Sequence, residues 1–439
     1  MKISLKHAAR ILDAWLPSKT LYDRTPGLSV GIVYKGKLAY ARGFGFADIE
    51  KRIRSTPDTC YRIASISKTF TAIAILQLAE RGKLRLNDPI KKHLEWVDGD
   101  LKNITIRQLL SHTGGMTRDG NTPHWTNDRF PDLKTLEKSV AETDLVASYR
   151  NRFKYSNFGF ALLGQVIERV SGMKYDEYVM KSIIKKIGMR HTKPDLTLES
   201  IRWLAKGYER PILGRKRRSF RHVPTHAYAS ATGFLSNVPD LAKYLSALSM
   251  GGRPLSITIQ KEMTREVART GTAGGKDGYG LGCMIREIRK HKVIGHGGSF
   301  AGFRTRMELD VKNDLGVIVL SNSIDGSPKE ISKGIFETIY DLPGILNRYG
   351  KRKIKGLEKC EGIYRNRWRD VAVVSMGNCL LAFDPRENSP VGMVTILTEK
   401  GPGRFLINSK DVFDRIGEEA RFRGKKLMWG GMPYDKIAV

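Results

Sequence analysis

The spacing of apolar and polar residues predicts a succession of strands and helices along the chain. Residues 28–42 contain two β-rich runs on either side of Gly36, which favours a hairpin that turns at this glycine. In residues 65–81 apolar side chains recur at helical spacing, and Gly82 stands where a helix would end. Residues 240–250 show the same helical pattern, with one apolar face.

Strand patterns return after a middle region that is mostly helix and loop. Asn313 and Asp314 separate the last two of these runs, and both residue types favour a tight turn. Strands at both ends of a helical middle predict one antiparallel sheet that distant segments close, with a helical subdomain inserted. We therefore expect an α/β (α+β) fold. The later strands are predicted over residues 292–296, 303–310 and 315–321, and a final helix over 328–341.

The last part of the chain has a different character. Residues 351–355 form a basic linker, and residues 356–439 consist of short β-rich pieces separated by Gly, Asn, Asp and Pro. Several short strands at this spacing are typical of a small antiparallel β-barrel or sandwich. The charge also changes, because residues 356–439 carry 14 basic and 11 acidic side chains and hold only +3 of the total charge of +31. The sequence predicts two domains, residues 1–350 and 356–439.

Composition adds a strong positive charge to this outline. The 439 residues include 76 Lys and Arg against 45 Asp and Glu, so the chain should attract anions such as nucleic acids, membrane surfaces or acidic substrates. The densest basic stretch, residues 215–222, contains only Phe220 as an aromatic, whereas single-strand-binding sites interleave aromatics with charges. We expect a solvated loop there, and no specific nucleic-acid partner.

Several other classes of protein are disfavoured. Four cysteines without a CxxC pair argue against a disulfide scaffold or a zinc ribbon and fit a reducing compartment. The sequence has no HExxH motif and no cysteine cluster, so we expect no metal and no cofactor. It also has no signal-peptide-like start and no apolar run long enough to span a membrane. We expect a cytoplasmic protein.

The strongest chemical signal is Ser65-Ile66-Ser67-Lys68 at the start of an apolar helix. A spacing of three residues places Ser65 and Lys68 on one face of a helix, about one turn apart. Serine is a weak nucleophile until a base removes its proton, and a buried lysine can lose its own proton near neutral pH. A lone S-x-x-K motif is common by chance, and the alternative is a capping serine beside an exposed lysine.

Two further motifs accompany it. Tyr155-Ser156-Asn157 precedes an apolar helical stretch, and His296-Gly297-Gly298-Ser299 lies on a predicted strand. S-x-x-K, Y-x-N and H-x-G, in this order, resemble the three motifs of the serine β-lactamase and penicillin-binding-protein superfamily. Longer stretches such as ITIRQLLSHTGG and FKYSNFGFALLGQVIERVSG resemble its class C β-lactamase-like branch, which also holds D-aminopeptidases and DD-carboxypeptidases. The resemblance covers about residues 20–345.

The resemblance implies a role for each motif residue. Ser65 would be the acylated nucleophile and Lys68 its base, and Tyr155, with its phenol pKa lowered, would pass a proton to the leaving group. Asn157 would orient Lys68 and hold a substrate amide. In the strand motif, His296 would contact the substrate carboxylate or tune Tyr155, and Gly298 and Ser299 would bind the substrate. The N–H groups of Ser65 and Ser299 would form the oxyanion hole. His112, in the LLSHTGG stretch, is expected to lie in a structural turn that follows a helix.

The strand motif departs from that of true β-lactamases, which usually carry lysine where this chain has His296. We expect the charge of this histidine to vary near pH 6–7. The histidine and the C-terminal barrel, which resembles the lipocalin-like barrel of an archaeal self-compartmentalising serine peptidase, favour a homo-oligomeric peptidase or aminopeptidase acting on small peptides, including those with D-residues. Carboxylesterase or β-lactamase activity at the same site, or a non-catalytic binding module, are the alternatives.

Overall fold

The computed structural model describes the chain in segments that form two compact units. One unit combines Met1–Thr25 with Lys329–Val439, and the other comprises Pro26–Pro328. The predicted boundary between residues 1–350 and 356–439 stays a prediction, because residues 350–353 lie outside the described residues. The described residues are 5–146, 151–212, 215–249, 251–270, 277–349, 354–409 and 415–437.

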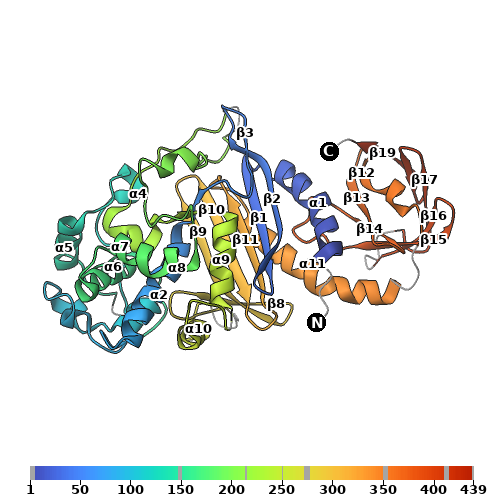
Figure 1. The fold of residues 1–439 in the computed structure, drawn as a ribbon. Helices are drawn as coiled ribbons and strands as arrows, with labels where there is room; N and C mark the ends of the chain where they lie inside the picture. Colours follow the sequence, from blue (N-terminus) through green and yellow to red (C-terminus); the bar gives the residue numbers. More distant parts are fainter. Residues whose placement is uncertain are drawn as a thin grey trace. The chain divides into compact units, whose positions relative to one another are not determined.

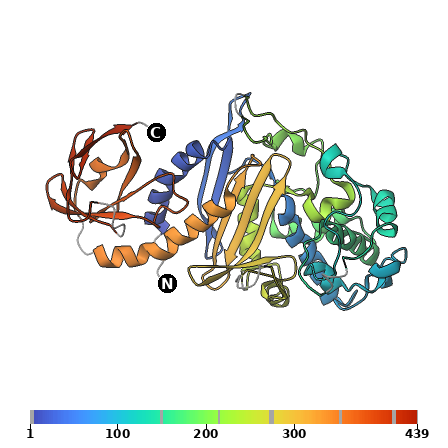
Figure 2. The same ribbon diagram turned by 180° about the vertical axis from the view of Figure 1, so that it is seen from behind.

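The unit Pro26–Pro328 is built around one antiparallel sheet (Figure 1). Its order is β3-β2-β1-β11-β10-β9-β8-β7-β6, and β1 pairs directly with β11, with Leu28 opposite Ser321. Strands from the two ends of the unit therefore lie side by side, as Figure 2 shows from behind, which confirms the predicted closure. The strands are β1 (Gly27–Tyr34), β2 (Lys37–Asp48), β3 (Ile53–Arg54), β6 (Ala268–Arg269), β7 (Gly278–Tyr279), β8 (Met284–Ile288), β9 (His291–Phe300), β10 (Phe303–Asp310) and β11 (Leu315–Ser321).

Turn residues fix both predicted hairpins. Lys35 and Gly36 join β1 to β2 with φ of 50° and 71°, the left-handed conformation that a tight hairpin turn requires. Asp314, at φ 47°, plays the same part between β10 and β11. The two hairpins lie side by side in the sheet, in the order β2-β1-β11-β10.

Helices are inserted between the outer strands, as predicted. α2 is buried along most of its length because apolar residues surround it, so it forms the core of this helical region. α9 packs on β1, where Gly31 leaves room for Val238: a Cβ at this glycine would lie 2.4 Å from Val238 Cγ1. The helices are α2 (Ser67–Glu80), α3 (Ile106–Leu110), α4 (His124–Asn127), α5 (Leu133–Ala141), α6 (Asn157–Ser171), α7 (Tyr175–Val179), α8 (Lys185–Ile187), α9 (Val238–Leu248) and α10 (Ile257–Thr264).

One member of the basic stretch 215–222 is not solvated. Arg217 Nη1 donates to Asp325 Oδ1 at 2.7 Å and to the carbonyl oxygen of Glu209, also at 2.7 Å. The expectation of a solvated loop is therefore wrong for Arg217, whose side chain is only 9% exposed. Arg215 and Arg218 are exposed, in agreement with it.

The described part of the second unit contains the α-helices α1 (Leu5–Tyr22) and α11 (Pro328–Tyr349), the 3₁₀ helix η9 (Leu357–Cys360) and a closed antiparallel barrel. β12 pairs with both β13 and β19, which closes the barrel and confirms the sequence prediction. The stretch RFRGKKLMW, residues 421–429, forms a hairpin that turns at Gly424, with φ 58°. The strands are β12 (Gly362–Arg365), β13 (Asp370–Ser375), β14 (Leu380–Phe383), β15 (Thr395–Gly401), β16 (Arg404–Asn408), β17 (Glu419–Arg423), β18 (Lys426–Trp429) and β19 (Met432–Ile437).

α1 is held to residues that lie more than 300 positions later. Trp15 is fully buried, its Nε1 donates to the carbonyl oxygen of Glu387 at 2.9 Å, and its ring packs against Gly334 of α11. Lys19 Nζ donates to the carbonyl oxygen of Arg386 at 3.0 Å. None of the helices within the described ranges has the length and hydropathy needed to cross a membrane.

Candidate active site

Ser65 lies in a short 3₁₀ helix, η1 (Ala64–Ile66), which runs directly into α2. The strand β4 (Tyr61–Arg62) leads into it and pairs with β5 (Leu235–Ser236), so this approach is fixed by the fold. Ala64 has φ 51°, a conformation that costs energy in a residue with a Cβ and is found most often at functional sites. The backbone thus turns sharply just before Ser65, which is half-buried.

Lys68 makes the contact with Ser65 that the spacing predicts. Its Nζ lies 3.2 Å from Ser65 Oγ, 2.7 Å from Asn157 Oδ1 and 2.8 Å from the carbonyl oxygen of Ala231. Ala231 belongs to a π-helical turn, η8 (Ala229–Gly233), a rare geometry that often marks functional sites. Three elements distant in sequence therefore converge on one amine.

Burial favours the neutral form of Lys68. The side chain is fully buried, which lowers its pKa well below the usual value for lysine; the charge of Asp119 opposes this effect, and that of Arg118 adds to it. A neutral amine has two N–H groups and one lone pair. Because Asn157 and Ala231 offer only acceptors to Lys68, those contacts take the two N–H groups and leave the lone pair for Ser65.

Tyr155 stands in the loop just before α6, whose first turn is capped by Ser156 accepting from the N–H of Gly159 at 2.8 Å. The Tyr155 ring centroid lies 4.8 Å from Lys68 Nζ, and its hydroxyl is near enough to Ser65 for that serine to oppose the rise in the Tyr155 pKa. Burial raises the pKa of Tyr155, so the expected lowering is wrong. Desolvation outweighs the nearby positive charge, and Tyr155 is a phenol that can donate a proton.

His296 is the clearest correction to the sequence analysis. It is 1% exposed, its Nδ1 lies 2.6 Å from the carbonyl oxygen of Gly297, and its Nε2 lies 3.0 Å from the hydroxyl of Tyr279. A carbonyl can only accept, so Nδ1 carries the hydrogen and Nε2 accepts from Tyr279. Burial lowers the pKa of His296 to about 3. Its charge does not vary near pH 6–7.

The strand that carries His296 passes close to the segment before Ser65. A Cβ at Gly298 would lie 2.1 Å from the carbonyl oxygen of Ile63, so only glycine allows β9 to come this near. Thr305 of β10 donates to the same carbonyl at 3.1 Å. Ser299, the next residue on β9, is exposed. The strand motif and the S-x-x-K motif are thus brought together.

Sequence reasoning missed Asp119. Its Oδ1 accepts from Asn157 Nδ2 at 2.7 Å and from Trp125 Nε1 at 2.8 Å. Asn157 in turn accepts from Lys68, so Asp119 orients the amide that holds the Lys68 amine. It lies in an irregular loop, where neither helical nor strand periodicity singles out one acid, and only the position just after SHTGGMTR could have drawn attention to it.

His112 packs against the site although we expected only a turn. It follows α3 with φ 58°, which agrees with a turn. Its buried ring lies 4.4 Å from that of Tyr155, and its Nδ1 accepts from the N–H of Ser156 at 3.1 Å. Burial lowers the pKa of His112 well below its usual value, so the ring is neutral and positions the loop of Tyr155.

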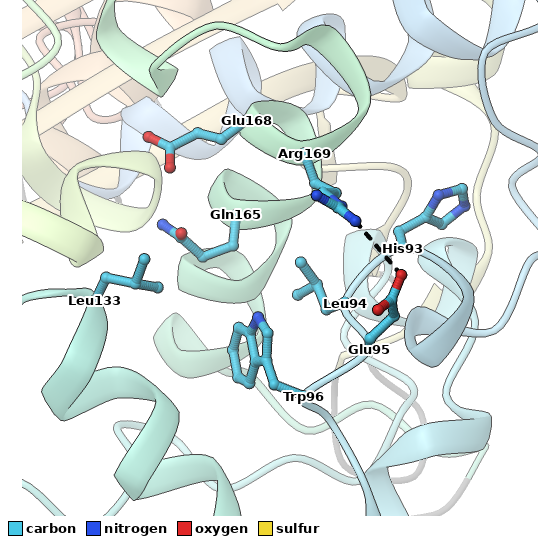
Figure 3. Close-up of a pocket in the computed structure, with 8 residues that line it drawn as sticks. All are labelled: His93, Leu94, Glu95, Trp96, Leu133, Gln165, Glu168 and Arg169. Atoms are coloured by element: carbon cyan, nitrogen blue, oxygen red, sulfur yellow. Dashed lines mark hydrogen bonds and ion pairs between the residues drawn. The ribbon is translucent and has the colours of Figure 1, made fainter.

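The hollow drawn in Figure 3 is separate from the candidate site around Ser65. It has a volume of about 530 Å³ and lies along the later turns of α6, where Gln165, Glu168 and Arg169 line it (Figure 3). Asn157, at the first turn of this helix, does not line it. Within the described segments, no group of three or more His, Cys, Asp or Glu side chains is placed to hold a metal ion.

Comparison with known proteins agrees with this geometry. A family model described as Beta-lactamase matches residues 19–337. Protein flp of Staphylococcus aureus strain N315 is 30% identical over 312 residues, which make up 68% of this chain but only 59% of that protein. The teichoic acid D-alanine hydrolase of Staphylococcus aureus is 30% identical over 324 residues, 72% of this chain and 77% of that protein.

Two solved structures are also similar. The octameric penicillin-binding protein homologue from Pyrococcus abyssi has a TM-score of 0.66 and 25% identity, and the match covers 98% of this chain and 99% of that one. A D-stereospecific amidohydrolase from a Streptomyces species has a TM-score of 0.63 and 25% identity, over 76% of this chain and 98% of its own. The first match extends through the barrel, and the second does not span the whole chain.

Proposed function

The chain belongs to the Beta-lactamase family and is a serine hydrolase, and we propose that it cleaves amide bonds of short peptides through an acyl-enzyme on Ser65. The observation that carries this proposal is the hydrogen-bonding of Lys68 Nζ, whose lone pair is left for the Ser65 hydroxyl, 3.2 Å away. A nucleophile beside an oriented base is the minimum that acyl transfer needs.

In the proposed reaction, Ser65, Lys68 and Tyr155 pass one proton between them. The Ser65 hydroxyl gives its proton to Lys68 as Oγ bonds to the substrate carbonyl carbon, and the N–H groups of Ser65 and Ser299 receive the oxyanion. Tyr155 protonates the leaving nitrogen as the C–N bond breaks, and the Lys68 ammonium restores the proton to Tyr155. Water then attacks the acyl carbon, loses a proton to the same pair, and releases the acid while Ser65 regains its hydroxyl.

Short peptides that contain D-residues are the proposed substrates. Two similar proteins bear names that refer to D-alanine hydrolysis and to D-stereospecific amide hydrolysis, which supports this class. Penicillins are less favoured, because His296 is neutral and cannot provide a permanent charge for their carboxylate. Esters remain the second candidate, because ester and amide hydrolysis share the acyl-enzyme and differ in how much the leaving group needs the Tyr155 proton.

We also propose that the protein forms a homo-oligomer and that it is located in the cytoplasm. The octameric homologue matches this chain over nearly its full length, including the barrel, which supports an assembly of several copies. Light scattering of the purified chain tests it, and a mass near the 49.4 kDa of one chain would contradict it.

Labelling of Ser65 tests the catalytic assignment. A fluorophosphonate should label the wild type at Ser65, and Ser65→Ala should lose both the label and the hydrolysis of D- and L-alanine p-nitroanilides, p-nitrophenyl acetate and a chromogenic cephalosporin. Ser111→Ala is the matched control, because Ser111 is buried and its hydroxyl donates to the carbonyl oxygen of Arg107 at 2.8 Å. A label found on another serine would exclude Ser65 as the nucleophile.

A further inference from the structure

We propose that Arg118 binds the carboxylate of the substrate's leaving group and so selects peptides cleaved next to a free C-terminus. The inference rests on the proposed function, and it names a substrate feature that the catalytic residues do not recognise. Arg118 lies in the loop between α3 and α4 and is not part of any of the three motifs.

Binding of a leaving-group carboxylate needs a positive charge. His296, the residue expected to contact the substrate carboxylate, does not provide one. His296 is buried and neutral, and both of its ring nitrogens are engaged within the protein. Arg62 is also unsuited, because it is 1% exposed, stacks on the ring of Phe300 at 4.4 Å and pairs with Asp195. Lys68 is inside the site and must remain neutral to act as the base.

Arg118 lies on the side of the site where the leaving group would depart. Its guanidinium carbon is 5.2 Å from the ring centroid of Tyr155, the residue that is placed to protonate that group. Its charge lowers the pKa of Tyr155, Lys68 and His112, so its field reaches all three. The side chain is nevertheless 66% exposed and can meet a ligand that arrives from solvent.

The loop holds Arg118 in this place. Its carbonyl oxygen accepts from the backbone N–H of Asn157 at 2.7 Å and of Phe158 at 3.2 Å, which ties it to the start of α6. Its Nε lies 3.4 Å from Asp119 Oδ2, so Asp119 is held between Arg118 and the catalytic amide of Asn157. A guanidinium forms two parallel hydrogen bonds with a carboxylate, a geometry that an ammonium cannot reproduce.

Two esters of N-acetyl-D-alanine test this inference. The m-carboxyphenyl and phenyl esters share the acyl group and differ only by a carboxylate on the leaving group. We expect the wild type to prefer the first, and Arg118→Gln to reduce the ratio of their kcat/KM values about 10- to 100-fold. Arg118→Lys should recover part of the ratio, and added salt should lower it in the wild type.

Arg85→Gln is the matched control for loss of one positive charge. Arg85 is exposed and lies beyond the far end of α2, roughly 20 Å from Ser65 by the rise of that helix. This variant should keep the wild-type ratio. The ratio of the two kcat/KM values cancels any change in acylation chemistry that affects both esters. An Arg118→Gln enzyme with the wild-type ratio would overturn the inference.

A binding measurement separates failure of this inference from failure of the proposed function. If the wild type hydrolyses neither ester, the proposed function is wrong, and calorimetric binding of N-acetyl-D-alanyl-D-alanine still decides the role of Arg118. A Kd that rises about tenfold in Arg118→Gln but not in Arg85→Gln would support that role. Equal Kd values for the two variants would overturn it.

Discussion

Lys68 is buried away from water, and yet its amine needs hydrogen-bond partners. Most lysines avoid this conflict because their amines are exposed to solvent. Burial lowers its pKa, and the acceptors Asn157 and Ala231 keep the amine oriented toward Ser65. Asp119 and Arg118, neighbours in sequence, then adjust the same pKa in opposite directions. The loop that carries both therefore adjusts the pKa of the proposed base.

Opposite charge changes in this loop should shift the pH profile in opposite directions. In the proposed mechanism activity needs neutral Lys68, so the rate should fall as the pH drops through the pKa of Lys68. Asp119→Asn removes a charge that raises this pKa, and the acidic limb of kcat/KM should move to lower pH. Arg118→Gln removes a charge that lowers it, and the limb should move to higher pH. Titration of fluorophosphonate labelling measures both shifts.

The sequence could identify site residues that follow a local spacing, but not properties that depend on burial in the folded chain. Ser65 and Lys68 follow from a three-residue spacing that any helix turns into a contact, and the structure contains that contact. The protonation states of Tyr155 and His296 could not be predicted, because both depend on desolvation by residues from other elements. The same holds for Asp119, whose importance lies entirely in contacts across the fold.

At the scale of elements, the strands and helices of the unit Pro26–Pro328 were largely predictable, because hairpin turns and helical periodicity are local signals. β10 and β11, for example, end where the sequence predicts. The short β4–β5 pair and the π-helical turn were not, since each is fixed by partners more than 150 residues away.

Gly298→Ala should separate activity from folding. The new Cβ would meet the Ile63 carbonyl oxygen at 2.1 Å, so β9 or the approach to Ser65 must move. A displacement near 1 Å costs about 100-fold in rate, whereas the added methyl destabilises the fold by about 1–3 kcal/mol. Enzyme kinetics and urea unfolding measure the two effects.

Gly344→Ala is the control for this substitution. Gly344 lies in α11, and a Cβ added there would have none of the described atoms within 4 Å. Alanine at this position should therefore stabilise the helix by about 0.5–1 kcal/mol and leave kcat/KM unchanged. Normal acylation by Gly298→Ala would mean that the close approach of β9 is not needed for catalysis.

At the scale of the molecule, the two ends of the chain form one unit. The barrel strands were predictable from short β-rich pieces between turn residues. That α1 joins them was not, because Trp15 and Lys19 meet partners that only the folded chain brings near. A sequence pattern shows that α1 has an apolar face, but not which surface covers it.

Trp15→Ala should therefore destabilise this unit strongly. Removing a fully buried indole leaves a cavity and an unpaired carbonyl at Glu387, at a cost of about 3–5 kcal/mol. Leu21→Ala on the same helix should change the unfolding free energy by less than about 0.5 kcal/mol, because Leu21 is 70% exposed. Similar unfolding curves for the two variants would show that α1 does not depend on Trp15.

The pairing of α1 with the barrel also has a consequence for synthesis. α1 leaves the ribosome well before its partners near residue 387 and the strand β19, which are made more than 300 residues later. At about 5–20 residues per second, α1 waits on the order of 20–80 s for the barrel to be complete. During that time Pro26–Pro328, which is continuous in sequence, can fold by itself, while the exposed apolar face of α1 is open to chaperones.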